Sequence, residues 1–240
     1  MAYIDGFVIA VPAGNKSGFI DHAGAADPVF TEQGATRILE CWEDDVPDGE
    51  RTDFRRAVQA TADERVVFSW IEWPSKEVRD AAHAKMDELM KTDPRMDPTR
   101  NPMPFDGKRM IYGGFAPLLD RGDGNGGYID GCLIPVPEES RDAYLAHAER
   151  SAALFEEFGA TRVVETWGDD VPEGKVTDFR RAVAAEQGEG VVFSWIAWPD
   201  KATRDAGWAK LMADGRMRGQ TMPFDGARMI YGGFTPVVEL

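Results

Sequence analysis

The sequence predicts an α+β fold in which two ferredoxin-like (βαββαβ) modules pair sheet to sheet, as an internal pseudo-dimeric α+β barrel. Three observations predict it. The stretch YIDGFVIAVP, which begins at Tyr3, recurs as YIDGCLIPVP from Tyr128, an offset of 128 − 3 = 125 residues. Each copy has strand and helix patterns in the order β-α-β-β-α-β, the split βαβ arrangement. Both faces of the third strand are apolar, so one sheet with helices on one side would leave apolar residues in water.

The repeat sets the domain organisation. We expect residues 1–120 to form the first module, residues 121–127 (RGDGNGG) a flexible Gly-rich linker, and residues 128–240 the second module. A period of this length is too long for a solenoid unit. The register slips near the end of each copy, because MPFDG begins at Met103 and at Met222, which are 222 − 103 = 119 residues apart. The second copy has therefore lost residues in the loop before its last strand.

The first part of each module is predicted as strand, helix, strand. Residues 3–11 are rich in β-branched and aromatic side chains and are followed by a proline, which is typical of a strand. Residues 16–33 have apolar side chains at helical spacing, and Gly34 follows as a helix C-terminal glycine. Residues 35–42 (ATRILECW) are predicted to form a second strand.

The second part of each module contributes the strongest strand signal. Residues 52–58 could extend a strand, and residues 65–73 (RVVFSWIEW) form the clearest strand in the chain. A proline ends that strand, and Ser75 is expected to cap a helix that runs to about Met90. After a proline-rich loop, residues 108–117 are predicted to form the final strand.

The third strand shows why the two copies should pack together. By alternation, Val67 and Ile71 point to one face of the sheet, and Phe68 and Trp70 point to the other. Helices of the same module can cover only one of these faces. We therefore expect the second copy to cover the other face.

Composition excludes several classes of protein. The net charge of −15 and a pI near 4.6 argue against nucleic acid, which needs a basic surface to displace its counterions. No apolar run approaches the ~20 residues of a membrane span, so we expect no membrane partner. The first residues lack the basic segment of a signal peptide. Cys41 and Cys132 sit at non-equivalent positions, which favours free thiols and a cytoplasmic location.

Four segments carry a resemblance to a known family: YIDGF, GATR with ECW-DDVP, VVFSWI-WP, and MPFDGKRMIYGGF. They closely resemble the YbaA-like family, a bacterial domain of unknown function, over nearly the whole of each copy. The resemblance implies the dimeric α+β barrel superfamily, whose usual member carries one module and pairs with itself. This chain would be the fused version. The resemblance supplies no reaction, because superfamily relatives include cofactor-free monooxygenases, haem-degrading enzymes, lactone isomerases and ligand-sensing domains.

Aromatic residues in the strands are candidates for ligand binding. If the two sheets face each other, these rings could line a cavity for a flat organic ligand. Paired glycines in the last strand of each copy would leave space beside them. The alternative is that the rings are core packing. The candidates are Trp42, Trp70 and Tyr112, with Trp167, Trp195 and Tyr231.

Two kinds of side chain are candidates for acid–base catalysis. His22 and His147 occupy equivalent helix positions, each three residues after an aromatic residue, and could act as general bases. Asp5 and Asp130 lie inside strand patterns, as Glu40 and Glu165 do, and a buried carboxylate with a raised pKa could abstract a proton. The alternatives are hydrogen-bonded histidines at the helix–sheet boundary and buried ion pairs with Arg37, Arg162, Arg109 or Arg228.

No motif indicates a cofactor or a metal, and none is expected. The pairs Asp44-Asp45 and Asp169-Asp170 could hold a hard cation, but their spacing fits no EF-hand, and a solvated loop is the simpler interpretation. Nucleotide-binding loops, CxxC, HExxH and GxSxG are all missing from the sequence.

The sequence therefore favours a protein that binds a small hydrophobic or aromatic metabolite in the barrel, with room for cofactor-independent acid–base or monooxygenase-like chemistry. The alternative is a non-catalytic structural or stress-associated interaction protein, whose doubled module provides stability. Free strand edges would leave further homo-oligomerisation open.

Overall fold

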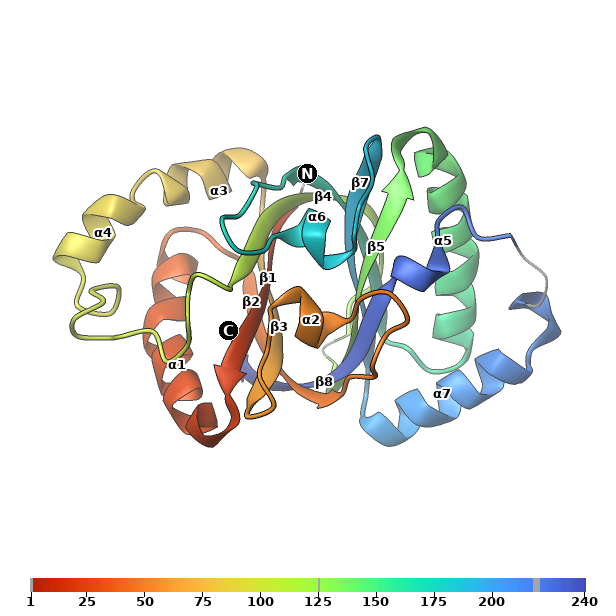
Figure 1. Ribbon diagram of the computed structural model, residues 1–240, viewed down its shortest axis with the longest axis horizontal. Coiled ribbons are helices and arrows are strands. Elements are labelled where there is room, and N and C mark those ends of the chain that lie inside the picture. Colours follow the sequence, from red (N-terminus) through yellow and green to blue (C-terminus); the bar gives the residue numbers. More distant parts are fainter. Residues whose placement is uncertain (1, 125, 218–220) are drawn as a thin grey trace.

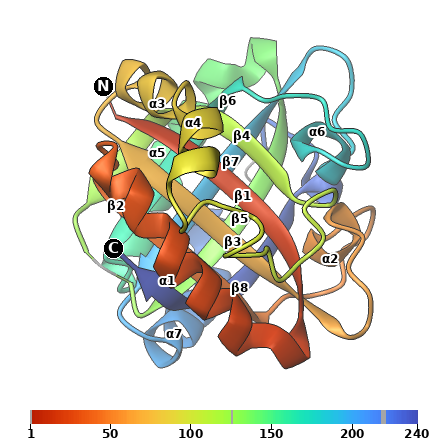
Figure 2. The same ribbon diagram turned by 90° about the vertical axis from the view of Figure 1, so that its left-hand side faces the viewer.

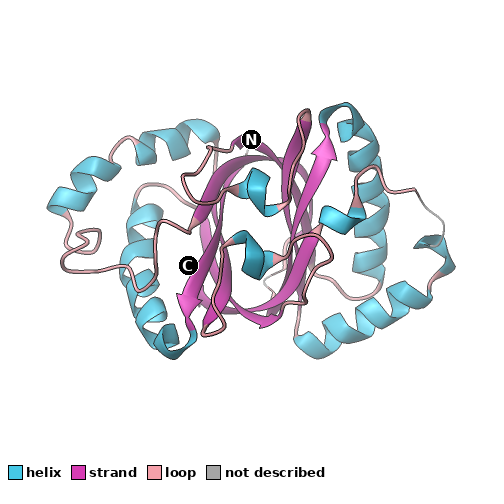
Figure 3. Cartoon of the chain, viewed as in Figure 1, coloured by secondary structure: helices cyan, strands magenta, loops and turns pink. Residues whose placement is uncertain are grey.

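The computed structural model describes residues 2–124, 126–217 and 221–240, which form a closed, eight-stranded antiparallel β-barrel with helices outside (Figures 1 and 3). The strands are β1 (Tyr3–Pro12), β2 (Arg37–Asp45), β3 (Glu64–Trp73), β4 (Ile111–Gly122), β5 (Tyr128–Pro137), β6 (Arg162–Asp170), β7 (Glu189–Trp198) and β8 (Ile230–Glu239). The α+β class is confirmed, and the two halves of the chain are built alike.

The helices lie on the outside of the barrel. The first half supplies α1 (Lys16–Glu32), α2 (Phe54–Ala57), α3 (Lys76–His83) and α4 (Met86–Thr92), and the second half supplies α5 (Arg141–Glu157), α6 (Phe179–Ala182) and α7 (Lys201–Ala213). Short 3-10 turns occupy Ala13–Asn15, Glu138–Ser140, Gly215–Met217 and Gly226–Arg228. Helices α1 and α5 flank the barrel on opposite sides, and α2 and α6 lie across the opening that faces the viewer in Figure 1. Figure 2 shows α1 running across the outer face of the strands of the first half.

The order of strands around the barrel is β1-β3-β2-β8-β5-β7-β6-β4, and β4 pairs with β1 to close it. Each half contributes four neighbouring strands, and two seams join the halves, β2 with β8 and β4 with β6. The expectation of free strand edges is wrong, because the last strand of each half hydrogen-bonds to the second strand of the other. That pairing satisfies the edge groups of both halves.

Residues 52–58 form no strand, which corrects the sequence prediction. Phe54–Ala57 is the one-turn helix α2, and Asp53 before it accepts a hydrogen bond from the backbone N–H of Arg56 at 2.8 Å. Aspartate is a strong N-cap, because its carboxylate satisfies an otherwise unpaired N–H of the first turn. Asp178 caps α6 in the same way.

The predicted ends of the longer helices are confirmed in part. Gly34 and Gly159 follow α1 and α5 with φ of +108° and +112°, the left-handed conformation that ends many helices. Ser75 caps α3 and accepts from the N–H of Val78 at 3.4 Å. The helix expected to continue to Met90 instead ends at His83 and restarts as α4.

Aromatic rings from both halves fill the barrel interior. The rings of Phe68 and Phe193 stack with centroids 4.5 Å apart, and those of Trp70 and Trp195 stack at 4.4 Å. All four side chains are at most 1% exposed. Gly6 makes room for this packing, since a Cβ there would lie 2.8 Å from the ring of Phe193. Gly131 does the same for Phe68. The second half therefore covers the inner face of the first sheet, as the apolar pattern of the third strand predicts.

Candidate functional site

Asp5 lies on the outer face of β1 beneath α3, and not inside the barrel. It is 2% exposed, and it accepts hydrogen bonds from Nε of Arg79 at 2.9 Å and from Nε1 of Trp73 at 2.9 Å. Nε2 of His83 lies 3.0 Å from the same carboxylate. The partner of Asp5 is thus an arginine of α3, and none of the four arginines that the sequence analysis named for it.

Asp130 occupies the same place in the second half. It accepts from Nε of Arg204 at 2.8 Å, from Nε1 of Trp198 at 2.9 Å and from Nε1 of Trp208 at 2.7 Å. Burial raises the pKa of this carboxyl group, and the charge of Arg204 opposes that rise. Trp208 stands where the first half has His83, since 208 − 83 = 125. Both copies thus place a ring nitrogen against the carboxylate at this position.

The same arginines connect the two halves. Nη1 of Arg79 donates to Asp170 at 2.8 Å, and Lys76 and Tyr3 both donate to Asp169, at 2.6 and 2.9 Å. Asp169 and Asp170 belong to β6 of the other half, so the expected solvated acidic loop is instead the end of a strand in ion pairs across a seam. The counterparts at the other seam are Arg204 with Asp45 and Tyr128 with Asp44.

The two predicted histidines lie apart from these clusters, between a helix and the MPFDG segment of their own copy. Nδ1 of His22 is 2.9 Å from the side-chain oxygen of Asn101, and Nε2 of His147 is 3.5 Å from the hydroxyl of Ser151. Burial lowers the pKa of both imidazoles. Each ring meets a phenylalanine edge-on, Phe105 or Phe224. The structure does not bring either histidine together with Asp5 or Asp130.

The predicted ligand-binding tryptophans divide between two environments. Trp70 and Trp195 stack on each other inside the barrel. Trp42 and Trp167 face outward, beneath Lys16 of α1 and the guanidinium of Arg141 of α5. The stacked and buried rings occupy the space between the sheets that the sequence analysis assigned to a ligand.

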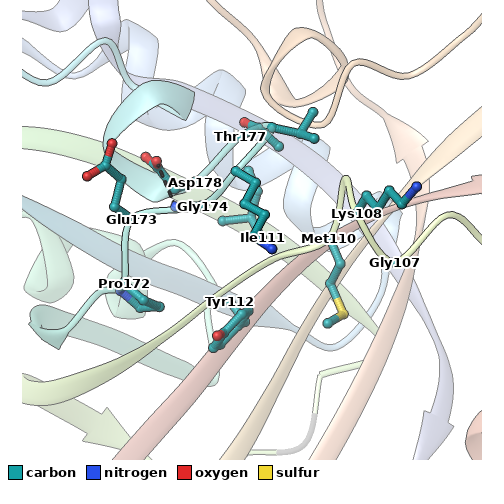
Figure 4. Close-up of a pocket in the computed structure, with 12 residues that line it drawn as sticks. Gly107, Lys108, Met110, Ile111, Tyr112, Pro172, Glu173, Gly174, Thr177 and Asp178 are labelled. Atoms are coloured by element: carbon teal, nitrogen blue, oxygen red, sulfur yellow. Dashed lines mark hydrogen bonds between the residues drawn. The ribbon is translucent and has the colours of Figure 1, made fainter.

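The predicted tyrosines are the exposed members of the set. Tyr112 is 47% exposed and Tyr231 is 49% exposed, which is unusual for aromatic residues in strands. Tyr112 borders a surface pocket of about 460 Å³ at a seam between the halves (Figure 4). The segment from Gly107 to Tyr112 forms one wall, and the loop from Pro172 to Asp178 forms the other.

Some polar side chains of this pocket already have partners. Asp178 caps α6 and also accepts from the N–H of Gly174 at 3.2 Å, and the hydroxyl of Thr177 donates to a backbone carbonyl at 2.6 Å. Among the described residues, the amino groups of Lys108 and Lys175 have no hydrogen-bond or ion-pair partner. The pocket therefore combines apolar side chains with two unpaired positive charges.

A second set of acids lies between the sheet and the long helices. Ser69 donates to Glu40, and Tyr144 donates to Glu165 at 2.6 Å. Burial raises the pKa of Glu40, with the nearby charge of Asp27 adding to the rise, and raises the pKa of Glu165 to about 7. Because their pKa values are raised, both carboxyl groups stay protonated to a higher pH than an ordinary glutamate. A neutral carboxyl group needs no arginine as a partner.

Glu165→Gln should remove part of the pH dependence of stability. A folded pKa of about 7 against an ordinary 4.5 means that the stabilisation is complete below pH 4.5 and is lost as the pH rises through 7. The difference corresponds to at most about 3 kcal/mol. The variant should match the wild type in urea unfolding at pH 4.5 and exceed it at pH 8. Glu149→Gln, on the exposed face of α5, is the control; equal profiles for all three proteins would contradict the assignment.

Sequence reasoning missed the partners of Asp5 and one wall of the pocket. A signal for the partners is present, because Arg79 and His83 are four residues apart and share one face of a helix. That Lys108 and Lys175 line the same pocket gives no local signal, because only the pairing of β4 with β6 brings their segments to one seam.

Comparison with known proteins shows the family to which the chain belongs. The chain belongs to the family described as "Protein of unknown function (DUF1428)", whose model matches residues 2–107 and 127–226. The "Uncharacterized protein YbaA" of Escherichia coli strain K12 is 60% identical over 120 residues, which are 50% of this chain and 99% of that protein. The protein of the same name from Shigella flexneri matches equally well.

Three solved structures share the fold over nearly the whole chain. A candidate monooxygenase of Fusobacterium nucleatum has a TM-score of 0.56 at 10% identity and covers 99% of this chain and 93% of its own. A candidate monooxygenase of Lactobacillus acidophilus has a TM-score of 0.55 at 9% identity, with 99% and 95% covered. An anthrone oxidase-like protein has a TM-score of 0.52 at 12% identity, with 100% and 92% covered. No helix in the described part of the chain could cross a membrane.

Proposed function

We propose that the chain binds a small organic molecule with a flat or apolar body in the pocket beside Tyr112. The observation that carries the proposal is the pocket itself, at about 460 Å³, because that volume lies in the range of small-molecule sites. Met110, Ile111 and Val176 offer apolar contacts, and the half-exposed ring of Tyr112 offers a surface for stacking.

The packing of the barrel supports this location over the interior. A ligand between the sheets would have to separate the rings of Phe68 and Phe193, which are stacked and fully buried. A ligand beside Tyr112 displaces only solvent. In this proposal the inner aromatic residues stabilise the scaffold, and Asp5 and Asp130 hold α3 and α7 against it through Arg79 and Arg204.

We also propose that the chain is an internal pseudo-dimer and that this pocket lies between its two modules. Residues 1–120 and 128–240 would be two ferredoxin-like modules, joined at residues 121–127, whose equivalent strands meet at two seams. The residue that corresponds to Tyr112 in the second copy is Tyr231, which is also half-exposed. We further propose a cytoplasmic protein without a nucleic-acid partner, because its charge is −15. Further homo-oligomers would have to form through surfaces other than strand edges.

Tyr112→Ala should weaken binding of a neutral aromatic probe, N-phenyl-1-naphthylamine, about tenfold or more, since stacking on a ring and the apolar contact are both lost. The fluorescence of the probe during titration measures this. Tyr231→Ala is the matched control for the loss of an equally exposed tyrosine, and unchanged near-UV circular dichroism would show that both variants fold. If the probe binds Tyr112→Ala and the wild type equally, or does not bind the wild type, the proposal fails and the non-catalytic structural role takes its place.

A further inference from the structure

The surface beside Tyr112 and the corresponding surface beside Tyr231 differ in charge. The wall residues Lys108 and Lys175 correspond to Ala227 (227 − 108 = 119) and Glu50 (175 − 50 = 125) on the other side of the barrel. Tyr112 has its counterpart in Tyr231. The aromatic residue is thus present in both copies, whereas both lysines are restricted to one.

The acids near the first pocket leave its positive charge uncompensated. The carboxylate of Glu173 accepts from Nη2 of Arg181 at 2.9 Å, and Asp178 accepts from two backbone N–H groups of its own turn. Lys108 and Lys175 have no such partner among the described residues, although the chain as a whole carries a net charge of −15. Two unpaired cations in such an acidic protein form a local attraction for an anion.

The second copy has the opposite balance. At the corresponding positions it carries Asp48 and Glu50, with Arg51, whose charge acts on the neighbouring Asp225. Arg56, the counterpart of Arg181, pairs with Asp53 at 3.1 Å. An anion placed beside Tyr231 would meet these carboxylates at short range. Electrostatic complementarity thus distinguishes two otherwise similar surfaces.

We propose, on the basis of the ligand pocket described above, that its ligand is a small aromatic or apolar monoanion, and that the corresponding surface beside Tyr231 does not bind it. The apolar body would contact Tyr112, Met110 and Val176. The anionic group, a carboxylate or a sulfonate, would lie between Lys108 and Lys175, whose flexible side chains can both reach the pocket mouth. One chain would therefore hold one anion.

A pair of probes that differ in charge tests this. 8-Anilinonaphthalene-1-sulfonate has the same rings as N-phenyl-1-naphthylamine and adds a sulfonate. In Lys108→Ala/Lys175→Glu, which copies the second module, the affinity for the sulfonate should fall about tenfold at low salt, and the affinity for the neutral probe should stay within about twofold. The difference in sulfonate affinity between the wild type and this variant should shrink as the salt concentration rises, because both lysines are exposed and their charges are screened. The reciprocal Ala227→Lys/Glu50→Lys should raise the stoichiometry of the sulfonate from one to two.

The outcomes separate the two proposals. If the neutral probe binds in a Tyr112-dependent manner but the lysine variant leaves sulfonate affinity unchanged, the pocket stands and the inference about the anion fails. If the lysine variant weakens both probes equally, the lysines act through the shape of the pocket, and the charge inference is again wrong. If neither probe responds to Tyr112→Ala, the pocket proposal itself fails.

Discussion

Arg79→Met is expected to destabilise the protein by about 3–5 kcal/mol, the range for removing one partner of a buried ion pair. Arg79 and Asp5 are only 5% and 2% exposed, so loss of the guanidinium leaves a buried carboxylate with only the ring nitrogens of Trp73 and His83 as partners. The same substitution removes the hydrogen bond to Asp170 across the seam. For a chain of this length, thermal unfolding should shift downward by roughly 10 °C.

The double variant Asp5→Asn/Arg79→Met isolates the electrostatic cause. It leaves no unpaired charge in the buried site, although Asp170 at the surface still loses its partner. The asparagine oxygen can still accept from Trp73, so the double variant should regain part of the lost stability. Arg204→Met tests the equivalent cluster, where Asp130 keeps the N–H groups of Trp198 and Trp208. A loss below about 1 kcal/mol for Arg79→Met would mean that Asp5 is hydrated or protonated and that the network contributes little.

Phe68→Ala should cost about 3–5 kcal/mol in the free energy of unfolding, as truncation of a buried phenylalanine does. Phe68 is fully buried, stacks on Phe193, and fills the space above Gly131. Since that glycine belongs to the other half, the truncation opens a cavity between the two sheets. Urea unfolding at constant pH measures the loss.

Phe68→Leu, which keeps most of the volume, is the milder control. Phe193→Ala should have a similar effect, and the double alanine variant should lose less than the sum, because the two rings contact each other. If Phe68→Ala proved nearly neutral and bound an aromatic probe more tightly than the wild type, the barrel interior would be a ligand cavity, contrary to the packing described above.

Much of the fold can be predicted from the sequence because its signals are local or repeated. The offset of 125 residues identifies two similar halves, and alternation in β3 indicates a second apolar face that must be covered. Helix ends such as Ser75 and Gly34 are local features. One exception is α2, because TDFRR is predicted as a strand until Asp53 is recognised as a cap.

The site is less predictable, because it depends on contacts between residues far apart in the chain. Asp5 can be identified from the sequence as a carboxylate in a strand. Its partner Arg79 cannot, because that contact depends on how α3 crosses β1, and Arg79 is itself held by Asp170 of the other half. Trp70 and Tyr112 look alike as strand aromatic residues, although one is buried against Trp195 and the other lies at the surface. Closure of the barrel determines which of these residues is buried. The strands that pair when the barrel closes are far apart in the sequence, so no short sequence pattern predicts the pairing.

We propose above that ligands bind beside Tyr112 and outside the barrel. The most direct measurement is the set of backbone and indole N–H signals of ¹⁵N-labelled protein during titration with 8-anilinonaphthalene-1-sulfonate. We expect shifts confined to residues 107–112 and 174–178, with the indole signals of Trp70 and Trp195 unmoved. Shifts centred on Phe68, Trp70 and Trp195, with the segment around Tyr112 unaffected, would contradict the account and return the ligand site to the barrel interior.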